Sequence, residues 1–197
     1  MDQPKTRRGR ESRDAIVRAA ATLMYERGVR ATSVDDVLLA AQASKSQVYH
    51  YFKTKEDLAA AVLERQLEQV LGEQERFRLE TWTGVRAMFD ALLEGQQARG
   101  YRGCPVGSLA AEMTAISDDM AVRVRAAFAR WQHSLESAFG QMQANGRLAR
   151  GPRAELLAEV TLAQIQGAYL LSTAMQEIGP MKSALNAAYM YLRSYSY

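Results

Sequence analysis

Residues 32–58 have the sequence TSVDDVLLAAQASKSQVYHYFKTKEDL and contain three helix-start signals within a short span. The signals are Ser33, Ser44 and Thr54, each with an Asp or Gln three positions later. In such a capping box, the hydroxyl and the later side chain each accept a hydrogen bond from a backbone N–H at the start of the helix. Starts this close together predict two very short helices in series, followed by a longer third helix.

The turn between the two short helices comprises residues 42–44. Two short helices joined in this way are typical of a helix-turn-helix, whose second helix presents its N-terminal turn to base edges in the major groove of DNA. That N-terminal turn carries Lys45, Ser46 and Gln47. Lysine favours guanine and glutamine can pair with adenine, so these residues are candidates for base contacts.

The rest of this segment offers groups that suit the phosphate backbone of DNA. They are Tyr49, His50, Tyr51, Lys53 and Lys55. Hydroxyl, imidazole and ammonium groups contact phosphate and fix the orientation of a protein on the duplex. Val48 and Phe52, four residues apart, form the inward stripe that would seat the helix.

A structural interpretation of the same residues stays open. Ser44 and Gln47 would then serve only as caps, and Tyr49 and Tyr51 only as half-buried packing residues. Gln47 in particular cannot easily close a capping box and contact a base at the same moment.

Residues 32–58 closely resemble the signature of the tetracycline-repressor (TetR) family of transcriptional regulators. The similarity is carried by Ser44-Lys-x-x-Val-Tyr-His-Tyr-Phe52, by Lys55-Glu-Asp-Leu58, and by the Arg27-Gly28 ending of the preceding helix. The resemblance covers roughly residues 12–60 and implies both base and phosphate contacts from the matching positions. The full predicted DNA-binding set is Thr32, Ser33, Ser44, Lys45, Ser46, Gln47, Tyr49, His50, Tyr51 and Lys55.

Gln42 departs from the family pattern, because the family usually has glycine at this position of the turn. A non-glycine residue in a left-handed conformation costs about 1–2 kcal/mol, which neighbouring packing can offset. The departure bears on the geometry of the turn and leaves the motif intact.

The whole chain reads as helical, because apolar residues recur at helical spacing and no window shows strand-like alternation. We predict helices at about 11–27, 33–41, 44–51, 54–77, 82–99, 105–116, 117–145, 152–178 and 181–193. The expected fold class is all-α, with a three-helix head that contains the helix-turn-helix and a six-helix body. We expect a disordered basic arm at 1–10, a DNA-binding domain at 11–54, and a ligand-sensing and dimerisation domain at 55–197.

Positive charge is concentrated in the predicted head. Residues 1–55 hold eleven Lys or Arg against six Asp or Glu, whereas residues 56–197 hold fourteen against sixteen. A basic head suits contact with phosphate, although basic N-termini are also common as solvated tails. No apolar run approaches the roughly 18 residues of a membrane helix, and the start does not resemble a signal peptide. We therefore expect a cytoplasmic protein with no membrane partner.

The predicted body supplies methionine and aromatic side chains that suit a pocket for varied apolar ligands, although such stripes are also typical of an ordinary core. The candidate lining residues are Met88, Phe89, Leu92, Met113, Phe128, Trp131 and Tyr169. The segment Gly103–Glu112 looks like one found in the regulatory domain of one branch of the family. The glycines at positions 100 and 103 would let the adjoining loop rearrange. We expect no metal and no cofactor.

The penultimate helix has a broad apolar face that suits dimerisation. The face consists of Leu156, Leu157, Val160, Ile165, Tyr169 and Leu170. A homodimer would place two recognition helices on a pseudo-palindromic operator in double-stranded DNA. In the resembling family, the last two helices of each subunit form a four-helix bundle. We expect a repressor that a small apolar or amphipathic effector releases from its operator, with the helix at 54–77 relaying the change.

Two alternatives stay open. An architectural or effector-independent DNA-binding protein would share the head but have a solidly packed body. A redox sensor would use Cys104, the only cysteine, whose pKa a nearby helix N-terminus would lower, although it has no resolving partner in its own chain. We do not expect an enzyme, because the body lacks a matched acid–base set, and its only histidine, His133, is interpreted as a surface or core residue.

Overall fold

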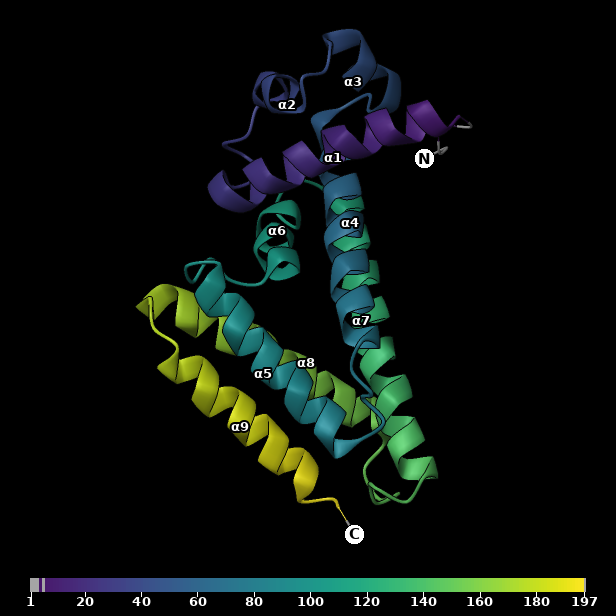
Figure 1. Ribbon diagram of the computed structural model, residues 1–197, viewed down its shortest axis with the longest axis vertical. Helices are drawn as coiled ribbons and strands as arrows, with labels where there is room; N and C mark the ends of the chain where they lie inside the picture. The colour runs from purple at the N-terminus through teal and green to yellow at the C-terminus, as the bar shows by residue number, and fades with distance from the viewer. Residues whose placement is uncertain (1–3, 5, 197) are drawn as a thin grey trace. The chain divides into compact units, whose positions relative to one another are not determined.

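The computed structural model describes residue 4 and residues 6–196, and all of its regular elements are α-helices (Figure 1). Their order in the described part of the chain is α1 (Arg7–Arg27), α2 (Val34–Ala41), α3 (Lys45–Tyr51), α4 (Lys55–Glu75), α5 (Trp82–Ala98), α6 (Pro105–Met113), α7 (Asp118–Ala144), α8 (Ala154–Met175) and α9 (Gly179–Arg193). The all-α class and the succession of helices predicted from the sequence are confirmed. None of these helices combines the length and apolar character needed to cross a membrane.

Helix α1 begins four residues earlier than the sequence analysis predicted. The Thr6 hydroxyl accepts a hydrogen bond from the Gly9 N–H at 3.1 Å and caps the helix, and Arg7 pairs with Glu11 one turn later at 2.7 Å. Residues 7–10, expected in an unstructured arm, therefore form the first turn of α1. Of the rest of that predicted arm, residues 1–3 and 5 lie outside the described residues.

Helix α2 begins at the predicted capping box and ends at the predicted unusual turn. The Ser33 N–H donates to Asp36 Oδ2 at 2.9 Å, and the Asp36 N–H donates to Ser33 Oγ at 3.1 Å. Hydrogen bonds from Ser33 to this carboxylate lower the pKa of Asp36. At the other end, Gln42 adopts a left-handed conformation with φ 51°, and its N–H donates to the Leu39 carbonyl at 3.3 Å. The turn of a helix-turn-helix thus forms with glutamine in place of glycine.

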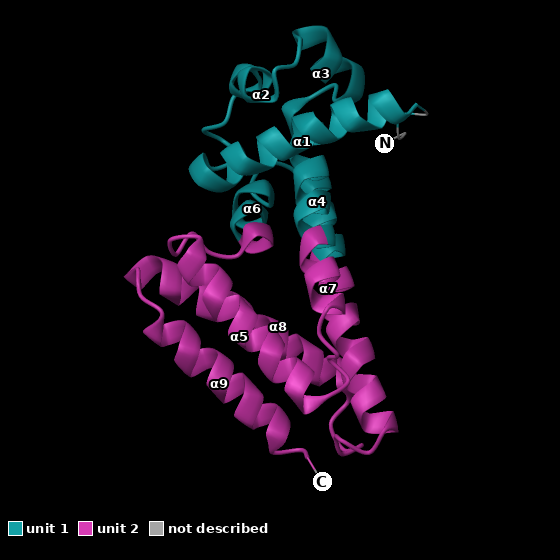
Figure 2. Cartoon of the chain, in the orientation of Figure 1, with its two compact units in different colours: residues 1–68, 108–127 teal, residues 69–107, 128–197 magenta. Residues whose placement is uncertain are grey.

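The chain divides into two compact units (Figure 2). Unit 1 contains residues 1–68 and 108–127, and unit 2 contains residues 69–107 and 128–197. Helices α4, α6 and α7 each contribute residues to both units. In unit 1, α1 packs against α2 and α3 around a core of Ile16, Ala20, Met24, Val37, Val48, Phe52, Leu58 and Val62.

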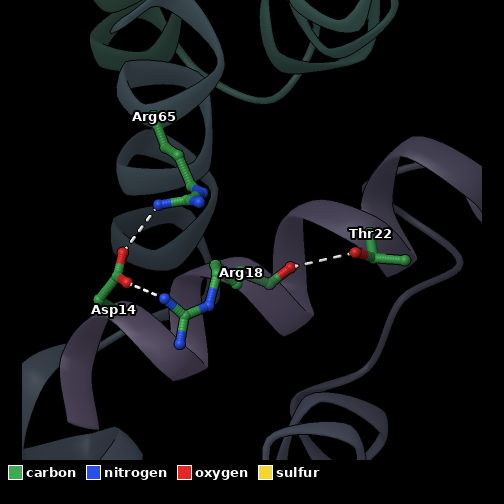
Figure 3. A network of polar contacts seen from close by, with 4 residues as sticks. All are labelled: Asp14, Arg18, Thr22 and Arg65. Atoms are coloured by element: carbon green, nitrogen blue, oxygen red, sulfur yellow. Dashed lines mark hydrogen bonds and ion pairs between the residues drawn. The ribbon is translucent and has the colours of Figure 1, made fainter. Parts of the chain in front are cut away.

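A polar network within unit 1 connects α4 to α1 (Figure 3). The Arg65 guanidinium on α4 pairs with Asp14 on α1 at 2.7 Å. Asp14 also pairs with Arg18 one turn further along α1. The side chains of Arg65 and Asp14 are 28% and 44% exposed, so this half-buried pair connects the first half of α4 to α1 and is partly screened by solvent.

In unit 2, α9 packs against both α8 and α5 (Figure 1). The apolar residues of α8 fall into a buried set and an exposed set, whereas the sequence predicted a single broad interface. Leu157 and Ile165 are 0% exposed and belong to the chain's own core, as does Tyr169. Leu156 and Leu170 remain 41% and 69% exposed, so they are apolar surface that the chain itself does not cover.

Candidate nucleic-acid interface

Helix α3 presents a polar face to solvent and an apolar face to the core of unit 1. Val48 and Phe52 are 2% and 1% exposed, as their spacing of one helical turn predicted. Lys45 and Ser46 at the N-terminus are exposed, and Tyr49 and His50 are exposed on the following turn. The helix is therefore seated through two buried side chains and offers hydrogen-bonding groups on its outer side.

Gln47 closes a capping box at the start of α3. The Ser44 N–H donates to Gln47 Oε1 at 2.7 Å, and the Gln47 N–H donates to Ser44 Oγ at 3.3 Å. The Ser44 and Ser46 hydroxyls lie 3.0 Å apart and share a hydrogen bond. Because the Gln47 carbonyl is engaged in the cap, a bidentate contact with adenine would require this cap to open.

The two candidate phosphate contacts at the start of α2 differ in accessibility. Thr32 is 1% exposed, and its hydroxyl donates to the Gly28 carbonyl at 2.8 Å, so it is a structural residue of the loop before α2. Ser33 is exposed. The expectation of a surface contact from Thr32 is corrected, because the loop folds its side chain inward to satisfy the Gly28 carbonyl.

The backbone of Arg30, in the loop between α1 and α2, is held from two other helices of unit 1. The Lys55 ammonium, at the start of α4, donates to the Arg30 carbonyl at 3.1 Å. The Glu112 carboxylate, on α6, accepts from the Arg30 N–H at 3.0 Å. Glu112 also fills the space beside Gly28, where a Cβ would lie only 2.6 Å from Glu112 Oε1. We refer to Lys55, Arg30 and Glu112 as the Arg30 clasp.

The Arg30 clasp was only partly anticipated from the sequence. Lys55 was predicted to contact phosphate; in this structure one of its three ammonium donors is engaged with the Arg30 carbonyl, which leaves that prediction untested. Neither Arg30 nor Glu112 was singled out, because they are 82 positions apart and no local pattern relates them. The clasp fixes the loop from which α2 departs.

We expect Glu112→Ala to loosen this loop, because it removes the acceptor of the Arg30 N–H. A hydrogen bond to a charged group contributes about 1.5–3 kcal/mol when shielded, and less at a partly exposed loop such as this one. A decrease of about 1 kcal/mol in the free energy of unfolding would lower the melting temperature by roughly 2–4 °C in a chain of this size. Hydrogen exchange at the Arg30 backbone amide should also become faster.

Glu112→Gln is the matched control, because glutamine keeps an acceptor oxygen at the same reach. Its melting temperature and Arg30 exchange should stay close to those of the parent protein. Equal effects of the two substitutions would contradict a role for the hydrogen bond and would indicate that the negative charge alone matters.

The predicted ligand-lining residues are distributed over both units. Met88, Phe89, Leu92, Phe128, Trp131 and Tyr169 belong to unit 2, and Met113 belongs to unit 1. Within unit 2, the rings of Phe128 and Trp131 stack with centroids 6.2 Å apart. Trp131 is 1% exposed, and its indole N–H has no hydrogen-bond partner. His133 is exposed and lies 3.3 Å from the Glu136 carboxylate, which agrees with the surface interpretation of this histidine.

Cys104 does not have the properties of a reactive thiol. It is 4% exposed, and burial raises the pKa of its thiol, although hydrogen bonds from the Gly107 N–H and the Gln166 amide act in the opposite direction. The donors lie 3.3 Å and 3.6 Å from Sγ. The lowered pKa considered for a redox sensor is therefore wrong, because desolvation of the thiolate outweighs the helix N-terminus.

A short exposed helix at the end of a capped helix-turn-helix, in a chain that continues into a larger helical unit, is the arrangement typical of DNA-binding regulators of transcription. Residues 16–62 match the family described as bacterial regulatory proteins, tetR family. Residues 82–187 match the C-terminal domain of LmrA/YxaF-like transcriptional regulators. The chain belongs to the TetR family of transcriptional regulators.

Individual relatives agree with this assignment. The transcriptional regulator AcuR of Cereibacter sphaeroides is 30% identical over 182 residues, which cover 84% of this chain and 82% of AcuR. The HTH-type transcriptional repressor DhaR of a Mycobacterium species is 25% identical over 162 residues, which cover 80% of this chain and 80% of DhaR. The crystal structure of a regulatory protein TetR from Rhodobacter sphaeroides superposes with a TM-score of 0.74, at 28% identity, over 90% of this chain and 97% of that one.

Proposed function

We propose that this chain is a homodimeric repressor that binds a pseudo-palindromic operator through α3 and leaves it when a small apolar or amphipathic effector binds the body. The observation that carries the DNA-binding part is the outer face of α3, where Lys45, Ser46, Tyr49 and His50 are exposed above a buried Val48. Ser33, Ser44, Gln47, Tyr51 and Lys55 complete the proposed interface. DhaR is named a repressor, which supports the proposed direction of regulation.

DNA binding and effector sensing are assigned to different parts of the chain, on the basis of the sequence and the helices. Residues 11–54 would form the DNA-binding domain, and residues 55–197 the sensing and dimerisation domain. The continuous helix α4, from Lys55 to Glu75, contains the Lys55 of the Arg30 clasp and extends into unit 2. A change in the body would therefore reach the loop before α2 through this helix. Effector binding must favour the released state by a coupling of about 1–3 kcal/mol or more to be useful.

We expect Lys45→Ala to weaken specific DNA binding, because Lys45 is exposed at the end of α3 that faces base edges. Loss of one good base contact costs about 1–3 kcal/mol, which corresponds to roughly 5- to 150-fold in affinity. A suitable operator can be obtained by selecting bound duplexes from a randomised pool. Affinity for the selected duplex and for an unrelated duplex of equal length should then be compared by fluorescence anisotropy.

Arg125→Ala is the control for a loss of positive charge, because Arg125 is exposed on α7, outside both the helix-turn-helix and the α8 and α9 surface. It should leave both affinities unchanged, which separates a local contact from a general loss of positive charge. If Lys45→Ala lowers affinity for the two duplexes equally, Lys45 contacts phosphate and does not read sequence. If it changes neither affinity, α3 is not the recognition helix.

The sensing part is tested by screening small molecules for release of the selected duplex. A true effector should raise the melting temperature of the free protein by mass action. By linkage, it should lower the affinity for DNA by the same factor by which DNA lowers the affinity for the effector. If no compound does both, the effector-independent DNA-binding alternative gains support.

A further inference from the structure

Arg99, at the end of α5, is a partly buried cation without an anionic partner. Its Nε is shielded from solvent and has no hydrogen-bond partner. Its Nη2 donates to the Tyr169 hydroxyl on α8 at 3.2 Å. No carboxylate among the described residues forms an ion pair with Arg99. A guanidinium that is removed from water without a counter-charge is costly, and buried charges are normally paired.

Several neutral polar groups lie near Arg99 in unit 2. Gln96, one turn earlier, is 0% exposed; its amide donates to Thr173 Oγ1 at 3.2 Å, and its carbonyl accepts from the Gly103 N–H at 3.2 Å. Cys104 lies close enough for the Arg99 charge to lower the pKa of its thiol, although burial outweighs this effect. These groups use their hydrogen bonds on one another, and none of them neutralises the guanidinium.

Gly95 makes room for this arrangement. A Cβ at position 95 would lie 2.8 Å from Arg99 Nη1 and 3.1 Å from Nη2, so the guanidinium lies over the bare glycine backbone. Glycine within a helix is less favourable than alanine by about 1 kcal/mol. A glycine at this position therefore has a local benefit, which is the placement of the Arg99 side chain next to Tyr169.

The face of α5 that ends at Arg99 changes from apolar to polar along its length. Met88 and Phe89 are 3% and 1% exposed, Leu92 follows one turn later, and Gln96 and Arg99 complete the same face. Arg99 stands seven positions after Leu92, which is a helix rise of about 10 Å. Met88 and Phe89 belong to the core of unit 2, whereas Leu92 is half-buried, so an apolar chain that extends from Arg99 along α5 would meet Leu92 first.

We infer that Arg99 and Tyr169 bind the carboxylate of an amphipathic effector whose apolar chain extends along α5 toward the half-buried Leu92. A planar guanidinium with a free Nε and Nη edge matches a carboxylate by two parallel hydrogen bonds. One cation suits a singly charged carboxylate better than a doubly charged phosphate. This inference rests on the proposed sensing function of the body and specifies the chemical class of its ligand.

The test uses straight-chain carboxylic acids from butanoate to dodecanoate, each compared with the primary alcohol of the same length, below their micelle concentrations at neutral pH. At least one acid should raise the melting temperature of the full-length protein more than its alcohol does. Arg99→Met should weaken binding of that acid by roughly 10- to 100-fold, as expected for hydrogen bonds to a charged group. The melting temperature of Arg99→Met without ligand should equal or exceed that of the parent protein.

Two further variants make the result specific. Gly95→Ala keeps the charge of Arg99 but displaces its guanidinium, so it should weaken acid binding without lowering the melting temperature of the free protein. Arg150→Met removes an exposed arginine of the same unit and should leave acid binding unchanged. The inference is overturned if every alcohol stabilises the protein as much as its acid does, or if Arg99→Met binds the acid like the parent protein.

The same titrations, repeated with the selected DNA duplex, separate this inference from the proposed function. Acids that bind through Arg99 but do not release DNA would support the carboxylate site and contradict effector-controlled repression. Release of DNA by neutral compounds alone, with no preference for acids, would overturn the carboxylate site and leave the proposed repressor function intact.

Discussion

Leu170→Glu is expected to convert the protein from a dimer to a monomer at micromolar concentration and to abolish tight operator binding. Leu170 on α8 is 69% exposed, and Leu156, fourteen positions earlier and hence on the same face of the helix, is 41% exposed. Leu171, Met175 and Met190 add exposed apolar surface on α8 and α9. An uncovered apolar face of this kind on two packed helices suits a self-complementary interface.

The expected size of this effect is large because a twofold interface places the new charge in it twice. Central interface residues typically contribute about 2 kcal/mol or more each, so the dissociation constant of the dimer should rise roughly a thousandfold. Sedimentation velocity measures the oligomeric state directly. A monomer offers only one recognition helix, whereas the operator presents two half-sites. Affinity for the selected duplex should therefore fall when the dimer dissociates.

Val122→Glu is the control for the exposed charge itself. Val122 on α7 is 53% exposed, which is comparable to the exposure of Leu170 and Leu171, but it stands outside the α8 and α9 surface. This variant should remain dimeric and bind DNA like the parent protein. A parent protein that sediments as a monomer, or a Leu170→Glu variant that stays dimeric, would refute the proposed interface.

Phe52→Ala is expected to destabilise unit 1 by about 3–5 kcal/mol, as measured for truncation of fully buried aromatic side chains. Phe52 caps the C-terminus of α3 and is 1% exposed. The Arg13 guanidinium of α1 lies 5.1 Å above its ring. Removing the ring therefore leaves a cavity beneath α3 and removes the contact of this side chain with Arg13 of α1. Amide exchange in α1 and α3 should increase sharply, and DNA binding should be lost with the fold of the head.

Tyr49→Ala is the matched variant on the same helix, because Tyr49 is 45% exposed. Its stability should change by no more than about 0.5 kcal/mol, as is usual at exposed positions. Its affinity for DNA should still fall if the hydroxyl contacts phosphate. A similar loss of stability in both variants would show that the outer face of α3 is part of the core packing.

The helix boundaries were predictable because their causes are local. A capping box joins residues three positions apart, so Ser33 with Asp36 and Ser44 with Gln47 could be recognised directly in the sequence. The start of α1 was not predicted, although it also depends on a local hydrogen bond, between Thr6 and Gly9. The cap at Thr6 was overlooked because the surrounding charges were interpreted as those of a solvated arm.

By itself, the sequence determined the all-α fold, the helix-turn-helix, and the inward positions Val48 and Phe52. Each depends on helical periodicity or on hydrogen bonds between near neighbours along the chain. It could not determine that Thr32 is buried, that Leu157 and Ile165 belong to the core while Leu170 does not, or that burial raises the pKa of Cys104.

Only the tertiary structure decided which distant groups meet. Glu112 and Arg30 are 82 positions apart, and Arg99 and Tyr169 are 70 positions apart. No pattern along the chain encodes such a pair, because the contact exists only when two helices pack and exclude water from the groups between them. Burial and charge pairing depend on that packing, and they decide which side chains of a helix hold the fold together and which are left to bind a partner.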